Sequence, residues 1–435
     1  MLKTIHQAAA ALREGKTTPI DLVEQCLAQI DAYEENVRAW VLIDRDLARK
    51  EADARLAELK AGVRRSELHG IPIGIKDIID VFDWPTACGS KQWANAIPRY
   101  DAEIVRRLRA AGAIFLGKTV TTAYASFDPP PTRNPWNPKH TPGGSSSGSA
   151  AAPATLMCLG AIGSQTGGSI TRPASYCGVA GCKPTYGLVP LEGIMPLAHS
   201  MDHPGPMARC VRDLEILLNV IQNPPPVRDS DEVELPPRLA VVRGLFEDLA
   251  EPAMRNAFGV AIETLRKAGA VIEEFVLPAD FGDVVRQHRI VMAVEAAQFH
   301  RDRLERRPDE YPPNIRKLLD DGIACPASDY ANAKSQQQRL SAFMRAAIDD
   351  RTIIAPAATG PAPTAETTGN PAFNSPWSFT GLPVVSFPVA FAPNGLPLAI
   401  QLAAGEYREL HLFRVAKWCE QAIGFDIGLP PRSRS

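Results

Sequence analysis

Three segments of the chain carry residues that could act together on a carbonyl carbon. Lys76 ends the apolar run IPIGIK, the glycine-serine loop GGSSSGS spans 143–149, and the run SQTGGS ends at Ser169. A serine attacks a carbonyl only when a base removes its proton, and a lysine can be that base only when it is uncharged. Taken singly the segments are ordinary, because serine-glycine runs are usually linkers and lysines at strand ends are usually solvated.

The residues around Lys76 favour its uncharged form. Ile71, Ile73 and Ile75 precede it, and burial among such side chains lowers the pKa of a lysine from about 10.4 towards about 7 or 8. Asp77 follows, but successive strand residues point to opposite faces, so its carboxylate need not stabilise the lysine cation. The sequence therefore predicts a lysine that can accept a proton.

The run GAIFLGKT at 112–119 has the spacing of a phosphate-binding loop, with Lys118 and Thr119 in the expected places. A phosphate-binding loop follows a strand and precedes a helix. Here the pattern predicts a helix before the motif and a strand inside it. This context argues against nucleotide binding.

The run GSSSG at 144–148 has the spacing of a nucleophile elbow centred on Ser146. An elbow needs a strand before it, and the prolines shortly before this motif are incompatible with a central strand. His199 and His203 flank Asp202 downstream. They keep a serine–histidine mechanism open as an alternative, although a structural role is the more common one for such histidines.

The elements that must position these segments follow an α/β pattern. The sequence predicts helices over 3–60, a strand over 70–75, mainly helices over 285–350 and strands within 382–402. Residues 134–149 are predicted to form a loop, because proline and glycine interrupt both periodicities. We expect one α/β domain with a mainly helical insertion.

Composition limits the possible classes of function. Hydrophobic residues make up 45% and charged residues 22% of the 435 residues, as in an ordinary globular protein. With 47 basic and 49 acidic residues the net charge is −2, which favours neither nucleic acid nor an anionic membrane surface as a partner. The eight cysteines are scattered and no apolar run approaches ~18 residues, so we expect a cytoplasmic protein with reduced thiols.

Taken together and in this order, the three segments resemble the amidase signature family. Its hallmarks are a lysine in an I-P-x-x-x-K-D stretch, a GGSSxGSA loop and a second glycine-rich GGS loop. The resemblance covers most of the chain, through the runs LHGIPIGIKDIID, NPWNPKHTPGGSSSGSAAA, GSQTGGSITRPASYCGVAGCKPTYG, GPMARCVRDLEIL and NSPWSFTGLPVVSFPVAF. Several long motifs occurring together make the match specific.

The resemblance implies an amidase signature fold, with one large mixed, twisted β-sheet covered by helices on both faces. A single amidase domain is expected over 1–435, with a helical N-terminal part at 1–65 and the signature core at 70–222. The mainly helical insertion at 285–350 is expected to shape the substrate pocket.

The resemblance also implies a role for each site residue. Ser169 matches the nucleophile, Ser145 the proton-relaying serine held after a cis peptide bond, and Lys76 the base. Ser146 matches a neighbouring serine that supports this network. The backbone N–H groups expected to form the oxyanion hole are those of Thr166, Gly167, Gly168 and Ser169. No metal or organic cofactor is implied.

Gly143, Gly144, Gln165 and Arg172 are expected to contact the substrate. Two of these positions depart from the family pattern, because many members have an aspartate where this chain has Gln165, and the arginine soon after the nucleophile is displaced to Arg172 by Thr171. These departures suggest a different substrate preference. In addition, proline interrupts the alanine-rich helix after the serine loop, so that helix is expected to start late or kink.

The sequence therefore predicts an amidase that cleaves the C–N bond of a small-molecule amide through an acyl-enzyme, giving a carboxylate and ammonia or an amine. We interpret it as closer to a free amidase than to the glutamyl-tRNA amidotransferase A subunit. A glutaminase-type amidotransferase subunit that works with a partner, and a non-catalytic family member, remain as alternatives. A homodimer is left open.

Overall fold

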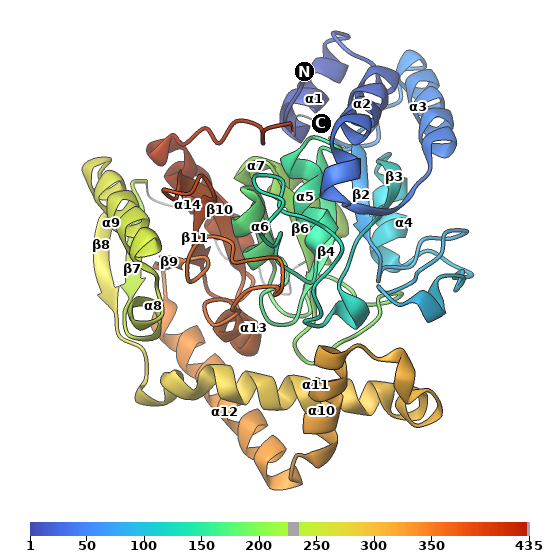
Figure 1. Ribbon diagram of the computed structural model, residues 1–435. Helices are drawn as coiled ribbons and strands as arrows, with labels where there is room; N and C mark the ends of the chain where they lie inside the picture. The colour runs from blue at the N-terminus through green and yellow to red at the C-terminus, as the bar shows by residue number, and fades with distance from the viewer. Residues whose placement is uncertain (225–234, 433–435) are drawn as a thin grey trace.

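One large sheet runs through residues 1–224 and 235–432, which the computed structural model describes (Figure 1). Its strands follow the order β1-β3-β2-β4-β6-β5-β10-β11-β9-β7-β8, with both parallel and antiparallel neighbours. They are β1 Trp40–Ile43, β2 Pro72–Lys76, β3 Ile114–Thr119, β4 Gly160–Gln165, β5 Ala180–Lys183, β6 His203–Ala208, β7 Arg238–Val242, β8 Val271–Phe275, β9 Thr352–Pro356, β10 Val384–Phe391 and β11 Pro397–Ala403. The prediction of an α/β fold with one large mixed sheet is confirmed.

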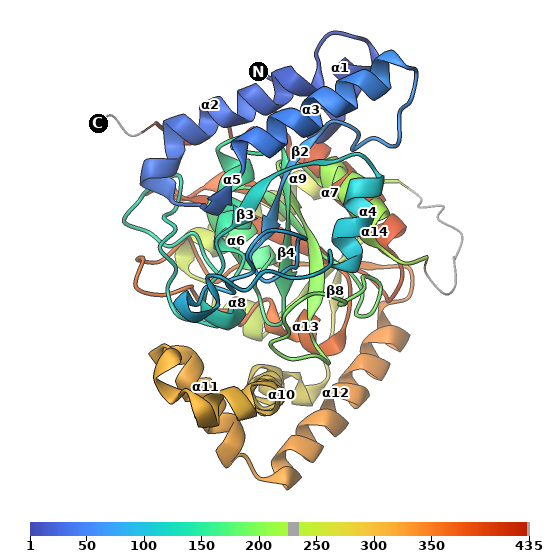
Figure 2. The ribbon, with the colours of Figure 1, turned by 90° about the vertical axis from the view of Figure 1, so that its right-hand side faces the viewer.

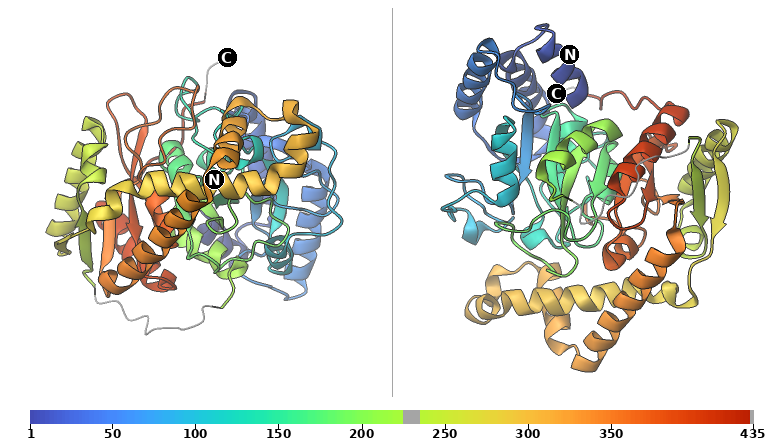
Figure 3. Two further views of the ribbon diagram at one scale, coloured as in Figure 1. Left: turned by 90° about the horizontal axis from the view of Figure 1, so that it is seen from below. Right: turned by 180° about the vertical axis from the view of Figure 1, so that it is seen from behind.

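Helices cover both faces of this sheet. The helices are α1 Ile5–Arg13, α2 Pro19–Val37, α3 Arg45–Lys60, α4 Glu103–Ala110, α5 Ser147–Ala154, α6 Thr171–Cys177, α7 Val211–Ile221, α8 Leu245–Asp248, α9 Pro252–Lys267, α10 Val284–Arg306, α11 Pro313–Ala324, α12 Ala327–Ile348, α13 Ser375–Thr380 and α14 Glu409–Ile423. α5 and α6 pack together over one face, and α4, α7, α14 and α9 form a row over the other (Figures 1 and 3). Among the described helices, none combines the length and the apolar character needed to cross a membrane.

Two groups of helices lie outside these layers (Figure 2). α2 and α3 pack against each other at the end of the sheet that carries β2 and β3. On the opposite side of the molecule from α2 and α3, α10 contacts both α11 and α12, and α13 contacts α10 and α12 (Figure 2). The segment predicted as mainly helical over 285–350 consists of α10 to α12.

The parallel strands β3, β2 and β4 bring two of the predicted site segments to one edge of the sheet. Ile75 of β2 pairs with Ile162 of β4, so both strands end at the same edge. β2 is buried along its whole length, which explains why its sequence is a continuous apolar run rather than an alternating one. Lys76 therefore ends β2 close to the segment that follows β4.

Two predicted element boundaries are wrong. The loop predicted for 134–149 ends early, because α5 begins at Ser147. A Cβ at Gly148 would lie 2.1 Å from the carbonyl oxygen of Ala39, so the close approach of α5 depends on this glycine. Pro153 lies in the last turn of α5, so the predicted late start does not occur. The helical segment 3–60 is interrupted by β1.

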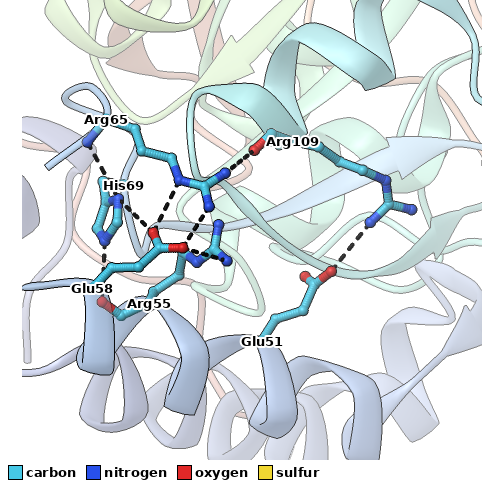
Figure 4. Close-up of polar contacts among 6 residues, drawn as sticks. All are labelled: Glu51, Arg55, Glu58, Arg65, His69 and Arg109. Atoms are coloured by element: carbon cyan, nitrogen blue, oxygen red, sulfur yellow. Dashed lines mark hydrogen bonds and ion pairs between the residues drawn. The ribbon is translucent and has the colours of Figure 1, made fainter. Parts of the chain in front are cut away.

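A polar cluster ties α3 to the core (Figure 4). Glu58 of α3 accepts a hydrogen bond from Nε of Arg65 at 2.9 Å and pairs with Arg55 at 3.0 Å. Glu51 also belongs to α3, and its carboxylate accepts a hydrogen bond from Arg109 of α4 at 3.1 Å. Because these side chains are partly exposed, each pair contributes little stability, and the cluster mainly fixes how α3 sits on α4.

Candidate active site

Lys76 is buried and bonded to two serines at the end of β2. Its Nζ donates to Oγ of Ser145 at 2.7 Å and to Oγ of Ser164 at 2.8 Å. Burial lowers the pKa of Lys76 to about 7, against the opposing effect of the carboxylate of Asp202. This shift favours the neutral amine near neutral pH, and the neutral amine can accept a proton.

Asp77 does not pair with Lys76, as the strand geometry predicted. Its Oδ1 lies 3.1 Å from Nζ of Lys118, and neither side chain is exposed. Lys118 also donates to Oγ1 of Thr86 at 3.0 Å. Lys118 is the lysine of the run that resembles a phosphate-binding loop. Because that run forms strand β3 and its lysine is held in a buried ion pair, the structure agrees that no phosphate-binding loop is present at this position.

Removing one partner of this ion pair is expected to destabilise the fold. Lys118→Met leaves the carboxylate of Asp77 buried without its counter-ion, which costs about 3–5 kcal/mol of unfolding free energy. Urea unfolding followed by circular dichroism measures the loss. The double variant Lys118→Met/Asp77→Leu removes both charges and should recover most of it. Equal stabilities of Lys118→Met and the wild type would contradict this role.

The serine loop is fixed in place before α5 begins. Gly143 has φ +82° and a Cβ there would lie 2.8 Å from Pro173, so this turn requires glycine. The peptide bond from Gly144 to Ser145 is cis. The carbonyl of Ser145 accepts from the N–H of Thr122 at 3.2 Å. These contacts hold the Ser145 hydroxyl against Nζ of Lys76.

Ser146 connects the serine loop to β4. Its Oγ donates to the carbonyl of Ser164 at 3.1 Å and accepts from the N–H of the same residue at 3.2 Å. Its own N–H donates to the carbonyl of Ser169 at 3.3 Å. Because Ser146 is fully buried and both roles of its hydroxyl are taken by Ser164, it is placed to support the network rather than to attack a substrate. This geometry does not fit the nucleophile-elbow alternative.

Ser169 lies beside the buried serines but reaches solvent. It is partly exposed, whereas the segment from Gly160 to Gly168 is buried. Within the described residues, no hydrogen bond joins the Ser169 hydroxyl to Ser145, and the two loops meet through the N–H of Ser146. Catalytic hydrogen bonds of this kind commonly shorten when substrate binds. The structure thus brings Lys76 and Ser145 into direct contact, with Ser169 adjacent.

The glycine-rich turn before Ser169 offers free donors. Within the described residues, the backbone N–H groups of Gly167, Gly168 and Ser169 donate to no protein atom. Consecutive unpaired N–H groups next to a serine have the composition of an oxyanion hole. The side chain of Thr166, in the same turn, is engaged elsewhere, because its hydroxyl donates to Oδ1 of Asp202.

The side-chain amide of Gln165 stabilises this turn by hydrogen bonds. Its Oε1 accepts from the N–H groups of Ile170 at 2.9 Å and Thr171 at 3.0 Å, and its Nε2 donates to Oγ of Ser378 at 3.2 Å. An aspartate could accept the first two bonds but could not donate the third. The departure from aspartate therefore exchanges a buried negative charge for a neutral amide with both functions.

Arg172 is a buried cation that has no carboxylate partner among the residues that the structure describes. Its Nη2 donates to the carbonyl of Gly144 at 2.8 Å and lies 3.4 Å from Oγ1 of Thr368. Its Nε and Nη1 have no partner in the described part of the chain, and only 1% of the residue is exposed. Burial lowers the pKa of Arg172 to about 10, so the guanidinium stays charged at neutral pH.

Sequence reasoning missed Ser164 and the position of Asp202 beside the candidate base Lys76. Ser164 supplies the second hydroxyl to Nζ of Lys76. Burial raises the pKa of Asp202 to about 6, and the N–H of Leu197 donates to its Oδ2 at 2.9 Å. Both line a cavity of about 240 Å³ that also reaches Thr166. Ser164 lies within the quoted run SQTGGS, but nothing in that run identifies which serine contacts the lysine.

The side chains best suited to hold a metal lie elsewhere. Among the described residues, His6, Cys210 and Asp213 bring potential ligand atoms within 4.8 Å of one another. Asp213 already accepts from the N–H groups of Ile5 and His6 at 2.8 and 3.0 Å and from Nδ1 of His6 at 2.8 Å. These bonds give the cluster a structural role at the start of α1.

Comparisons with known proteins agree with this fold. The profile of the Amidase family matches residues 21–413. The A subunit of glutamyl-tRNA(Gln) amidotransferase from Roseiflexus sp. (strain RS-1) is 34% identical, over 98% of both chains. A solved structure described as an amidase is 31% identical with a TM-score of 0.88, covering 96% of this chain and 99% of the other. The native peptide amidase of Stenotrophomonas maltophilia is 28% identical with a TM-score of 0.87, covering 99% of both chains.

The large mixed sheet and the buried lysine–serine pair thus belong to an enzyme of the hydrolase class that acts on carbon–nitrogen bonds. The chain is a member of the amidase signature family. Its relatives include both free amidases and a component of an amidotransferase. The comparisons therefore do not favour the free-amidase branch predicted from the sequence.

Proposed function

We propose that this protein hydrolyses an amide through an acyl-enzyme on Ser169, with Ser145 as proton relay and Lys76 as base. The observation that carries the proposal is the 2.7 Å hydrogen bond from the buried Nζ of Lys76 to Oγ of Ser145. A lysine whose pKa lies at about 7 exchanges protons readily at neutral pH. A solvated lysine at a strand end would have neither property.

In the proposed reaction, Oγ of Ser169 attacks the carbonyl carbon while its proton passes to Oγ of Ser145. The proton of Ser145 passes to Nζ of Lys76. The C–N bond then breaks, and the leaving nitrogen takes a proton by the reverse path. Water repeats the sequence on the acyl-enzyme and releases the carboxylate. The unpaired N–H groups near Ser169 would bind the oxyanion of both tetrahedral intermediates.

Active-site labelling tests this assignment. A broad serine-reactive fluorophosphonate, intact-mass analysis and peptide mapping should place one label on Ser169 in the wild type and none in Lys76→Ala. Label on Ser146 would restore the elbow alternative. Absence of label on every serine would favour the non-catalytic alternative over the enzyme.

We further propose that the preferred substrate carries a negative charge on its acyl part. A buried guanidinium with unpaired donors is costly unless an anion completes its partners. Arg172 is such a group, and it bonds to the carbonyl one residue before Ser145. Gly144 and the neighbouring Gly143 are included in this proposed binding region. A carboxylate on the substrate would supply an acceptor for one of these unpaired donors in a charge-assisted hydrogen bond.

Arg172→Gln tests the charge preference. We expect kcat/KM for an amide with a second carboxylate on its acyl chain to fall by about 10²-fold, because one charge-assisted pair is lost. Hydrolysis of the uncharged amide of equal length should change by less than about threefold. Steady-state assays of ammonia release on the two substrates measure the difference. Equal losses on both would contradict recognition of an anion by Arg172.

The relative from Roseiflexus favours a second candidate, because it is named as a component of an amidotransferase. In that case this chain would release ammonia from glutamine with the same residues, and a partner protein would raise the activity. Purification of a tagged chain from its native host, followed by a glutaminase assay, separates the two candidates. Glutamine hydrolysis that requires a co-purified partner supports the amidotransferase.

A further inference from the structure

Three side chains from distant elements hold three successive carbonyls of the turn before Ser169. Nδ1 of His203, on β6, lies 3.2 Å from the carbonyl oxygen of Gln165. Nε2 of His288, on α10, lies 2.9 Å from that of Thr166. Oγ of Ser378, on α13, donates to that of Gly167 at 2.9 Å. The turn is therefore held in place by hydrogen bonds from these three side chains to its backbone carbonyl oxygens.

Fixing a carbonyl also fixes the N–H of the following residue, because both belong to one planar peptide unit and point in opposite directions. The carbonyl of Thr166 shares its plane with the N–H of Gly167. The hydrogen bond to His288 therefore turns the N–H of Gly167 away from α10. This is one of the unpaired donors beside Ser169.

Glycine makes this external support necessary. Gly167 and Gly168 have no side chain of their own that could hold the turn, and glycine has the widest conformational choice of all residues. A Cβ on Gly167 would lie 3.3 Å from Cε1 of His288, and one on Gly168 would lie 2.8 Å from Oδ1 of Asn374. The glycines thus permit the close packing of α10 and α13 against the turn, and the packed side chains restore its rigidity.

His288 is suited to act as a permanent donor. It is 2% exposed, and burial lowers its pKa to about 4. Since a carbonyl only accepts hydrogen bonds, Nε2 must carry the single proton of the neutral ring. Phe379 lies edge-on to the imidazole with ring centroids 6.4 Å apart, and helps to keep the ring in this orientation.

We propose that His288 is a positioning residue that orients the N–H of Gly167 towards the oxyanion formed on attack by Ser169. The inference rests on the proposed function, because it presumes an acyl-enzyme at that serine. It gives α10 a part in catalysis through the turn. The expectation from sequence assigned this helical segment only to the substrate pocket.

Matched substitutions at His288 test the proposal. In His288→Gln the side-chain amide can place its nitrogen near the position of Nε2 and still donate to Thr166, whereas in His288→Asn the amide is too short. We expect His288→Asn to lower kcat by about 10²-fold, the usual effect of losing an oxyanion donor, with KM changed by less than about twofold. His288→Gln should retain at least about a third of the wild-type kcat.

His300→Gln is the matched control, because His300 is a second buried histidine of α10 and bonds instead to the hydroxyl of Tyr311 at 3.0 Å. Fluorophosphonate labelling rates provide a second readout, since phosphonylation also places charge on an oxygen in the oxyanion hole. The rate should fall in His288→Asn and not in His300→Gln. Equal kcat values and labelling rates for His288→Asn and His288→Gln would overturn the positioning role. A wild type that takes no label would overturn the proposed function itself, which separates the two failures.

Discussion

We expect Ser169→Ala to lower kcat for amide hydrolysis by about 10⁴-fold or more, with KM within about threefold of the wild type. The substitution removes the only atom proposed to bond covalently to the substrate, so no acyl-enzyme can form. The remaining oxyanion donors and binding contacts still give a rate above that of the uncatalysed reaction. Ser169 is partly exposed and at the surface of its turn, so the loss of its hydroxyl should leave the fold intact.

Ser175→Ala provides the control for this experiment. Ser175 is a buried serine of the following helix α6, and its Oγ has no partner within the described residues. We expect its alanine variant to keep at least about half of the wild-type kcat. The measurement is ammonia release over long incubations, together with fluorophosphonate labelling to exclude contaminating wild type. Full activity in Ser169→Ala would remove the proposed mechanism.

Lys76→Met is expected to lower kcat by about 10³-fold or more and to change the pH profile. In the wild type, the pKa of Lys76 is about 7. Below that pH the amine is protonated and cannot accept the proton of Ser145. The wild-type rate should therefore rise with pH through about 7 and level off above it.

The variant should lose this acid limb, and its residual rate should instead increase with hydroxide concentration. Lys183→Met is the matched control, because burial also lowers the pKa of Lys183 to about 7 while its Nζ donates to the carbonyl of Pro184 rather than to a serine. Assays of kcat/KM between about pH 5.5 and 9.5 compare the three proteins. If the acid limb persists in Lys76→Met and disappears in Lys183→Met, the base has been misassigned.

The fold was largely predictable because its strands are marked locally. The β-branched run before Lys76 and the apolar runs near the C-terminus became β2, β10 and β11. Boundaries failed where tertiary contact decides them. α5 extends into the predicted loop because Gly148 lets it approach the backbone of Ala39, a contact between residues far apart in the chain.

The site was predictable to the extent that its residues lie in recognisable runs. Lys76 and Ser145 are in direct contact, and the two hydrogen-bonding residues flanking them, Ser146 and Ser164, lie in the same runs. The residues that hold the turn lie outside those runs. His288 sits in the long helix α10, 122 residues after Thr166, and no periodicity or motif marks it. Such contacts depend on how α10 packs, which a single sequence does not specify.

The burial of Lys76 also links folding to proton release. The unfolded chain keeps this proton up to about pH 10.5, whereas the native protein loses it at about pH 7. Between these values the unfolded state binds more protons, so the contribution of this residue to the free energy of unfolding rises with pH and falls as pH drops towards 7. A base suited to neutral pH thus costs the folded state most at mildly acid pH, and Lys76 gives up its proton to the medium when the chain folds in that range.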